Sequence, residues 1–552
     1  MNDAIAEAIK NLYGADTSVV LTRPESRFGD YATNIALQLA KQLAKNPREV
    51  AEEVAAELRQ TDMFKQVDVA GPGFINLWLS DEALLAEAER EPARPLAGQT
   101  VVAEYSDPNP FKVLHAGHLY TTIVGDAIAR LLEAAGADVH RVNFGGDVGR
   151  HVARNMWAII KNLGGILPEK LNELDEDFHV RSAWLSARYV EGTEADENDE
   201  SAKNEITELN KQLYELIAAD DHESALAKIY WTCREWSYEY FKLFYNELGV
   251  VQFEKYYPES VTTPTGVETV KKGLENGVYE MSDGAVVFKA EKYGLHTRVF
   301  INSEGLPTYE AKDVGLIMQK WRDYNFDKSI IITGNDIQQY MKVVQKSIEQ
   351  FEPELVARSV HLTHGNLKLA GGKKMSSRKG TVLLALDVLE AAREAQAAQH
   401  DNANEPVVLG AVKYAFLSNR IGGDIVYDPE TSVSLHGNSG PYLQYAHARA
   451  CSIAAKSSVI ATKPEHLDES ERELVQKLSE SPESLEQAAE ELMPHLVCNY
   501  LYELAQAFNR FYEKSRIIGD EREAGRLYLL NLYRETLARG LNLLGISAPE
   551  KM

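Results

Sequence analysis

The feature that most constrains the fold is a strand–helix–strand pattern that begins near residue 100. Residues 101–105 form a short apolar run typical of a buried strand, and a proline-rich turn at 107–110 ends it. Residues 115–135 then carry apolar side chains at helical spacing, and residues 139–144 resemble a second strand. Two strands joined by such a helix lie parallel in one sheet, with a right-handed crossover. The pattern therefore predicts an open parallel α/β sheet.

The rest of the chain divides around this unit. At 552 residues it is too long for a single core, and its length suggests roughly three to four domains. We expect an α/β multidomain protein with a Rossmann-like parallel-sheet catalytic domain and a helical insertion, a small N-terminal α+β domain, and a C-terminal all-α helix bundle. The predicted boundaries are 1–97, 98–430 and 431–552.

Some local expectations can be checked against the structure. In the N-terminal domain a second helix is expected from about Tyr31, a third should begin at Asn46-Pro47, and residues 66–80 should form a hairpin. Further strands are expected at 329–333 and 360–362. The acidic stretch at 191–197 is most simply interpreted as a solvated surface loop.

Composition excludes some classes of protein. No apolar run approaches the ~20 residues of a membrane span, and the N-terminus lacks the features of a signal peptide, so no membrane partner is expected. Cys233, Cys451 and Cys498 are too scattered to form a zinc site, which favours a reducing, cytoplasmic location. The net charge of -25 argues against a nucleic-acid partner at first sight, but a local basic face can coexist with it.

The first chemical motif is His115-Ala116-Gly117-His118, where the first predicted strand gives way to the helix. Two imidazoles one turn apart can hydrogen-bond phosphate or ribose oxygens, and the helix N-terminus favours an anion. Gly117 leaves room for a flat base against the backbone. Alone, this signal is weak, because two histidines at this spacing are often structural.

The second motif lies far downstream, at residues 373–380. It combines cations and hydroxyls after Gly371-Gly372, and it includes Lys374, Met375, Ser376 and Ser377. Such a loop could close over a triphosphate and neutralise charge at the transferring phosphorus. Taken by itself, a solvated basic loop would be the commoner interpretation.

Together the two motifs resemble the HIGH and KMSKS signatures of class I aminoacyl-tRNA synthetases. Over nearly its full length the chain is similar to the arginine-specific family of these enzymes. The segments that carry this similarity are FGDYATN (28–34), GPGFIN (71–76), EYSDPN (104–109), GPYLQYAHAR (440–449) and the tail LGISAPEKM (544–552). The resemblance implies an arginyl-tRNA synthetase activity: ATP-dependent activation of L-arginine to arginyl-adenylate, then transfer to the 3′-terminal adenosine of tRNA(Arg).

The resemblance also implies roles for individual residues. The catalytic set is Lys112, His115, His118 and Lys374, and the ATP-binding set is His115, Gly117, His118, Lys374, Met375, Ser376 and Ser377. Arginine enzymes lack the second lysine of KMSKS, where this chain has Ser377, and carry a lysine three positions before HIGH, here Lys112. A cation that approaches the phosphates from the opposite side is a reasonable electrostatic substitute. The alternative for Lys112 is an ordinary surface lysine.

The arginine-binding set by resemblance is Glu104, Asn109, Tyr309, Asp313 and Gln338. Carboxylates and planar acceptors suit a guanidinium. Asp313 could instead be an exposed helix carboxylate, and Tyr309 could simply pack in the core. Gln338 is a candidate for the glutamine that some members of the family carry after the late strand.

The expected ligands and partners follow from the family. They are ATP with Mg²⁺, L-arginine and tRNA(Arg), with no metal held by the protein itself and a monomeric state. The resemblance further implies attack by the 2′-hydroxyl of the tRNA, and a first step that requires bound tRNA. The N-terminal domain should contact the tRNA elbow, and the aromatic and basic side chains of residues 500–516 belong to the bundle that should read the anticodon.

Three rival readings remain open. A cysteine-specific synthetase would need a zinc site, which the scattered cysteines do not supply. A glutamate- or glutamine-specific enzyme should present cations to its substrate rather than Glu104 and Asp313. A catalytically inactive tRNA-binding protein is opposed by the intact His115, His118 and Lys374.

Overall fold

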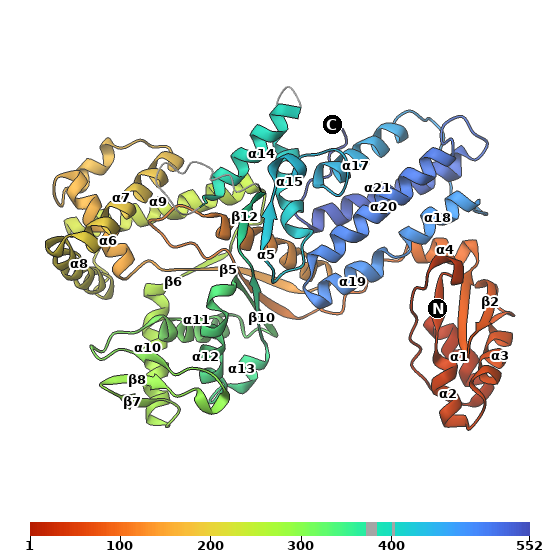
Figure 1. The fold of residues 1–552 in the computed structure, drawn as a ribbon, viewed down its shortest axis with the longest axis horizontal. Helices are drawn as coiled ribbons and strands as arrows, with labels where there is room; N and C mark the ends of the chain where they lie inside the picture. The colour runs from red at the N-terminus through yellow and green to blue at the C-terminus, as the bar shows by residue number, and fades with distance from the viewer. Residues whose placement is uncertain (371–382, 400–402) are drawn as a thin grey trace.

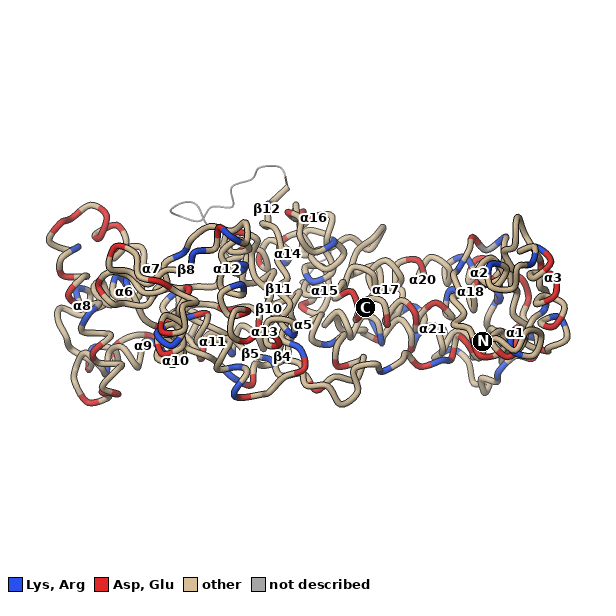
Figure 2. The backbone as a smooth tube through the Cα atoms, turned by 90° about the horizontal axis from the view of Figure 1, so that it is seen from below, with Lys and Arg blue, Asp and Glu red and all other residues tan. Residues whose placement is uncertain are grey.

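The computed structural model describes residues 1–370, 383–399 and 403–552 of the chain. Lys374, Met375, Ser376 and Ser377 lie outside these residues. Figure 1 shows the helical insertion and the parallel sheet on one side, the C-terminal helices on the other, and the N-terminal domain suspended below those helices. Acidic and basic residues are intermixed along the whole length of the described chain (Figure 2). No helix in the described ranges is long and apolar enough to cross a membrane.

The N-terminal domain packs helices against a small antiparallel sheet of order β1-β3-β2. Its elements are α1 (Asn2–Tyr13), η1 (Ser26–Phe28), β1 (Tyr31–Thr33), α2 (Ile35–Leu43), α3 (Pro47–Leu58), β2 (Phe64–Ala70), β3 (Phe74–Leu79) and α4 (Asp81–Ala88). The hairpin and the helix that begins at Pro47 are confirmed, and the Asn46 side chain caps α3. The helix expected from Tyr31 is wrong at its start, because Tyr31–Thr33 pairs with β3 and α2 begins only at Ile35.

The catalytic region is built on a five-stranded parallel sheet of order β11-β10-β4-β5-β6. Its strands are β4 (Thr100–Glu104), β5 (Asp138–Gly145), β6 (Lys255–Pro258), β10 (Lys328–Gly334) and β11 (Ser359–His364). The predicted parallel sheet is therefore confirmed. The chain order reverses beside β4, and such a switch point opens a crevice at the carboxyl ends of β4 and β10.

Helices and a small sheet surround this core. They are α5 (Ala116–Ala134), α10 (Glu259–Glu275), α11 (Tyr309–Tyr324), α12 (Gln338–Glu349), α13 (Pro353–Ala357), η3 (Glu291–Tyr293), η4 (Asn335–Ile337) and the antiparallel strands β7 (Glu280–Ser282), β8 (Ala285–Phe288) and β9 (Arg298–Ile301). Helices α10 and α11 cross closely, since a Cβ on Gly266 would lie 1.9 Å from the Ala311 carbonyl oxygen. This contact fixes the helix that carries Tyr309 and Asp313.

The insertion between β5 and β6 is helical. It comprises α6 (Arg150–Leu163), η2 (Pro168–Glu173), α7 (Phe178–Asn198), α8 (Glu200–Ala218) and α9 (Ala225–Leu248). The surface loop expected at 191–197 is wrong, because these residues form the end of α7. Asp196 is buried there and pairs with Arg150 and Arg154 of α6, which neutralise its charge.

The remaining chain is mainly helical. It comprises β12 (Leu367–Leu369), α14 (Ala385–Gln399), α15 (Glu405–Leu417), β13 (Ile425–Tyr427), α16 (Pro429–Ser432), α17 (Gly440–Ala454), α18 (Glu469–Leu478), α19 (Ser481–Glu491), α20 (Pro494–Lys514) and α21 (Glu523–Leu543). The N-terminal domain docks on this bundle through polar contacts. Arg472 of α18 donates to the buried Asp30 carboxylate at 2.6 Å and to Asp81 at 2.7 Å.

Candidate active site

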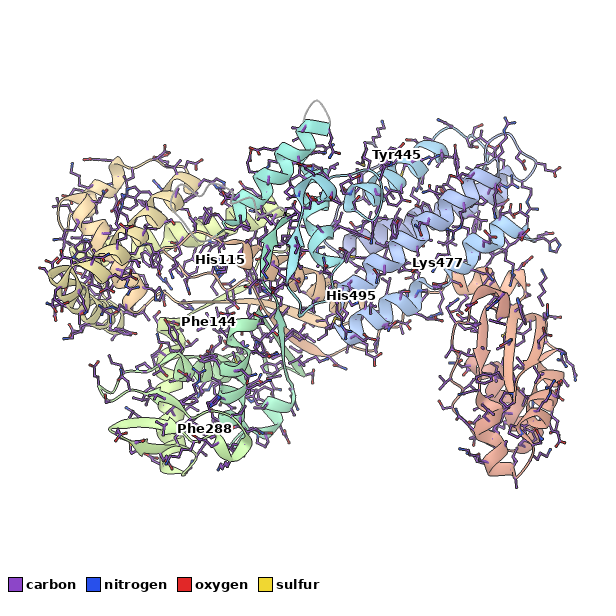
Figure 3. All side chains as sticks on the ribbon, in the orientation of Figure 1. His115, Phe144, Phe288, Tyr445, Lys477 and His495 are labelled. Atoms are coloured by element: carbon purple, nitrogen blue, oxygen red, sulfur yellow. The ribbon has the colours of Figure 1, made fainter. Side chains whose placement is uncertain are left out.

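The candidate site lies at the carboxyl ends of β4 and β10, where the sheet topology opens a crevice. The loop after β4 leads into α5, and α11 and α12 approach from the β10 side. Figure 3 shows His115 near the middle of the molecule, beside the insertion helices. Residues from β4, α5, α7, α11 and α12 thus contribute to one region.

His115 and His118 cap the first turn of α5 for each other. His115 Nδ1 accepts hydrogen bonds from the backbone N–H groups of Gly117 at 3.1 Å and of His118 at 3.3 Å. His118 Nδ1 accepts the backbone N–H of His115 at 3.2 Å. The two rings stack with their centroids 3.7 Å apart. The pair is therefore fixed by the helix end itself before any ligand binds.

The protonation state of the two rings follows from this arrangement. Burial lowers the pKa of His115, and burial lowers the pKa of His118 well below its ordinary value. The positive charge of Lys112 lowers both pKa values further. The rings are therefore neutral near pH 7. Because each Nδ1 is an acceptor, the ring proton resides on Nε2, and each ring can donate one hydrogen bond to an anionic oxygen.

Gly117 has a steric reason to be glycine. A Cβ at this position would lie 2.8 Å from Cε1 of His115. Any larger residue would displace the ring that caps the helix. The suggested role of Gly117 in admitting a flat base stays a prediction.

Lys112 lies on the face of an aromatic ring. Its Nζ is 4.3 Å from the ring centroid of Tyr189, which comes from α7 of the insertion. No carboxylate pairs with Lys112 in the described part of the chain. The positive charge of Lys112 is therefore available to a ligand. The alternative interpretation, an ordinary surface lysine, does not account for this arrangement.

A group of three carboxylates occupies the other side of the crevice; Glu104 is buried, and Asp107 and Asp313 are half-buried. Glu104, at the end of β4, pairs with the fully buried Lys320 of α11. Asp313, two turns earlier on α11, accepts a hydrogen bond from the Tyr340 hydroxyl of α12. Asp107 follows Glu104 in the loop; the charges of Glu104 and Asp313 help to raise the pKa of Asp107, and that of Glu104 helps to raise the pKa of Asp313. Three carboxylates thus share one lysine.

This excess of negative charge changes the titration of the group. Burial raises the pKa of Asp313 to about 7, and the nearby Glu104 contributes to the increase. Burial, with a further contribution from Glu104, also raises the pKa of Asp107 well above its ordinary value. Burial and the neighbouring negative charges disfavour ionisation of these carboxylates, so a further cation in the pocket would stabilise their ionised form. Asp313 is therefore a half-buried side chain that is bound by Tyr340, and the alternative interpretation as an exposed helix carboxylate is wrong.

Tyr309 stands at the first turn of α11 and is 60% exposed, which excludes the core-packing reading. Beside it, Lys312 forms a buried ion pair with Glu259 of α10 at 2.8 Å. The Lys312 Nζ also lies 5.2 Å from the Tyr309 ring centroid. The ring thus faces solvent at the edge of the carboxylate group, supported by a fixed cation.

The last two predicted arginine-site residues have other partners. Asn109 Oδ1 accepts the backbone N–H of Gly146 at 2.7 Å, which ties the loop after β4 to the end of β5. Gln338 donates from Nε2 to Thr363 Oγ1 on β11 at 3.3 Å. Within the described chain no hydrogen bond joins Gln338 to Asp313 or Tyr309. The structure therefore groups Glu104 with Asp313 but does not bring Gln338 to them.

Sequence reasoning missed four residues of this region. They are Lys320, which neutralises Glu104, Tyr340, which binds Asp313, Tyr189, which contacts Lys112, and Asp107. Asp107 lies within the EYSDPN segment and could have been singled out as a carboxylate beside Glu104. The other three are distant in sequence from their partners and carry no local signal.

The described residues contain no group of three or more His, Cys, Asp or Glu side chains that could hold a metal ion. The carboxylates of the crevice are occupied by Lys320 and Tyr340 instead. The side chains of the described residues therefore offer no ready-made metal site.

Comparison with known sequence families divides the chain into three matches. Residues 1–79 match the arginyl tRNA synthetase N terminal domain, residues 81–428 match the catalytic domain of class I (R) tRNA synthetases, and residues 443–552 match the DALR anticodon binding domain. The catalytic-domain match alone covers more than half of the chain.

Curated relatives give the same picture. An arginine–tRNA ligase of Porphyromonas gingivalis is 29% identical over 597 residues, which covers 100% of this chain and 99% of that protein. An arginine–tRNA ligase of Treponema denticola is 32% identical over 83% of this chain and 80% of that protein.

Solved structures agree as well. The arginyl-tRNA synthetase of Thermus thermophilus superimposes with a TM-score of 0.79 at 26% identity, and the match covers 100% of this chain and 99% of that one. The arginyl-tRNA synthetase of Plasmodium falciparum, at 21% identity and a TM-score of 0.76, shares the fold over 100% of this chain and 98% of that one.

Proposed function

The chain belongs to the class I arginyl-tRNA synthetase family, and from that premise we propose how its residues divide the work of the reaction. As a member of this family it charges tRNA(Arg) with arginine, and the family uses ATP as a substrate. Arginine is first joined to AMP and is then transferred to the 3′-terminal adenosine of the tRNA.

Asp313 and Tyr309 bind the guanidinium group of arginine, while Glu104 and Asn109 contact the amino acid from the end of β4 and the loop that follows. The observation that carries this assignment is the group of three neighbouring carboxylates, Glu104, Asp107 and Asp313, in which the pKa of Asp313 is raised to about 7. A guanidinium would supply the missing positive charge and favour the ionised carboxylate. Gln338 is a candidate for a further contact if arginine binding breaks its bond to Thr363.

The phosphates of ATP lie at the opposite end, against the first turn of α5. The Nε2–H groups of the neutral His115 and His118 donate to phosphate or ribose oxygens, and Gly117 lets the nucleotide approach the backbone. Lys112 approaches from the side of the insertion. Lys374, with Met375, Ser376 and Ser377, closes over the triphosphate from the downstream loop.

The first step needs no nucleophile from the protein. The arginine carboxylate attacks the α-phosphorus in line, the bond to the β-phosphate oxygen breaks, and pyrophosphate leaves. The cations of Lys112 and Lys374 stabilise the charge that develops on the leaving group. Mg²⁺ enters as part of the MgATP substrate, since the described side chains do not fit a resident metal site.

In the second step the 2′-hydroxyl of the terminal adenosine attacks the acyl carbonyl, and AMP leaves. Bound tRNA is required already for the first step.

We assign elbow contacts to residues 1–97, catalysis to 98–430 and anticodon recognition to 431–552. Within α20, Tyr500, Phe508 and Phe511 are buried. We therefore assign the recognition of bases to less buried side chains of this helix and to the residue that follows it. These side chains are Tyr502, Arg510, Tyr512, Lys514 and Arg516. The enzyme acts as a monomer in the cytoplasm.

The test is ATP–pyrophosphate exchange with each of the twenty amino acids, with and without tRNA(Arg). Exchange with arginine only, and only when tRNA is present, supports the proposal. Exchange with glutamate or glutamine instead would contradict the carboxylate pocket while leaving the nucleotide site in place.

A further inference from the structure

Lys112 contacts the aromatic ring of Tyr189 and pairs with no carboxylate in the described part of the chain. Most of the described lysines that make a short polar contact pair with a carboxylate, as Lys320 does with Glu104 and Lys312 with Glu259. Lys112 has no such partner among the described residues, and its Nζ lies 4.3 Å from the centroid of the Tyr189 ring. The charge is thus held without being neutralised.

The helix that carries this ring is fixed to the catalytic core. On α7, residues 189, 192 and 196 lie on one face, since they are three, four and seven positions apart. Gly192 packs directly on α6, because a Cβ there would lie 1.9 Å from the Arg154 carbonyl oxygen. Asp196 receives Arg154 Nη2 at 2.5 Å and Arg150 Nε at 2.9 Å. The backbone of α7 at Tyr189 is therefore held in a fixed position relative to α6.

An aromatic ring suits this position better than a carboxylate would. A carboxylate beside Lys112 would cancel its charge and would also repel the phosphates of ATP. The face of an aromatic ring attracts an ammonium through its quadrupole and leaves the full unit charge for a second partner. Lys112 is also close enough to the histidine pair to lower the pKa of His115 and of His118.

We propose that Tyr189 is a positioning residue that holds the Lys112 ammonium over the phosphate end of the active site, so that the insertion helix α7 takes part in arginine activation. This rests on the proposed function of Lys112 as the cation that replaces the second lysine of KMSKS. Tyr189 acts only through Lys112 and only through its ring. Its hydroxyl is not needed.

The experiment measures tRNA-dependent ATP–pyrophosphate exchange for the full-length wild type, Tyr189→Phe, Tyr189→Leu, Lys112→Met and the double variant Tyr189→Leu/Lys112→Met. Tyr189→Phe keeps the ring and should retain most of the activity. Tyr189→Leu should lower kcat by about tenfold, the scale of one cation–π contact, with little change in the KM for arginine. The double variant should be no slower than Lys112→Met alone.

Trp184→Leu is the matched control on the same helix. The Arg188 guanidinium carbon lies 5.3 Å from the centroid of the Trp184 ring, whereas the Lys112 ammonium contacts Tyr189, so the loss of Trp184 tests general loosening of α7. An equal loss of kcat in Trp184→Leu and Tyr189→Leu would overturn the proposal, as would additive losses in the double variant or an unchanged Tyr189→Leu. A wild type that shows no arginine-dependent exchange would instead contradict the proposed function itself.

Discussion

The two ends of the crevice differ in the charge of their side chains. At the arginine end, Glu104, Asp107 and Asp313 crowd together, and Lys320 is the fixed cation among them. At the phosphate end, two neutral imidazoles stand beside Lys112, whose charge no carboxylate in the described chain cancels. The carboxylate end can therefore attract a positively charged guanidinium group, and the Lys112 end can attract negatively charged phosphates. On the proposed assignment, selectivity depends on charges that the protein leaves incompletely neutralised at each end, and four changes test this dependence.

The largest effect is expected from Asp313→Asn. It removes the carboxylate that we propose binds the guanidinium and keeps its shape, so arginine activation should fall by several hundredfold, about 3–4 kcal/mol. Exchange kinetics should show the loss mainly in the KM for arginine, while a filter assay should find tRNA binding nearly unchanged. Equal losses of activation and of tRNA binding would indicate misfolding or a wrong assignment.

Next is Lys320→Met, which leaves Glu104 buried without its partner. Breaking a buried ion pair from one side should reduce the free energy of unfolding by about 3–5 kcal/mol. Urea unfolding followed by circular dichroism measures this change. The double variant Lys320→Met/Glu104→Leu should recover much of the stability, and a single variant as stable as the wild type would show that Glu104 is neutralised by another group.

A smaller loss is expected from Lys112→Met at the phosphate end. Adenylate formation should slow by about tenfold, or 1.4 kcal/mol, with the KM for arginine unchanged. Single-turnover adenylate formation is the measurement. A rate equal to that of the wild type would remove Lys112 from the role of substitute cation.

The last test varies the pH and leaves every side chain in place. The folded-state pKa of Asp313 is raised from 3.8 to about 7 by burial, so without arginine its carboxyl group is protonated below that pH. Arginine binding needs the carboxylate, so the KM for arginine should rise about tenfold for each pH unit below about 7 and stay flat above it. The same raised pKa makes the folded apo-enzyme gain stability as pH falls from about 7 towards about 4. A KM for arginine that does not change between pH 6 and pH 8 would contradict the assignment.

The parallel sheet was predictable because its central strands are buried runs that the local sequence reveals, such as Thr100–Glu104 and Asp138–Gly145. Where long-range contacts decide the structure, local reasoning failed. Tyr31–Thr33 forms a strand because β3 is available to pair with it, and the acidic end of α7 is helical because Arg150 and Arg154 bind Asp196.

The same division applies to the site. His115, His118 and Asp313 carry signals in short motifs and could be proposed from sequence. Lys320 and Tyr340 are recognisable only when folding brings them to Glu104 and Asp313. Lys374 lies outside the described residues, so its role stays a prediction from the KMSKS-like motif.

The central claim is that the carboxylates of the crevice select arginine. The most direct test is the aminoacylation of total tRNA with each of the twenty radiolabelled amino acids, using the wild type and Asp313→Asn side by side. The account predicts that the wild type charges arginine alone and that the variant charges little of any amino acid. If the wild type charged another amino acid, or if Asp313→Asn charged arginine at the wild-type rate, the carboxylate pocket would not be the source of selectivity.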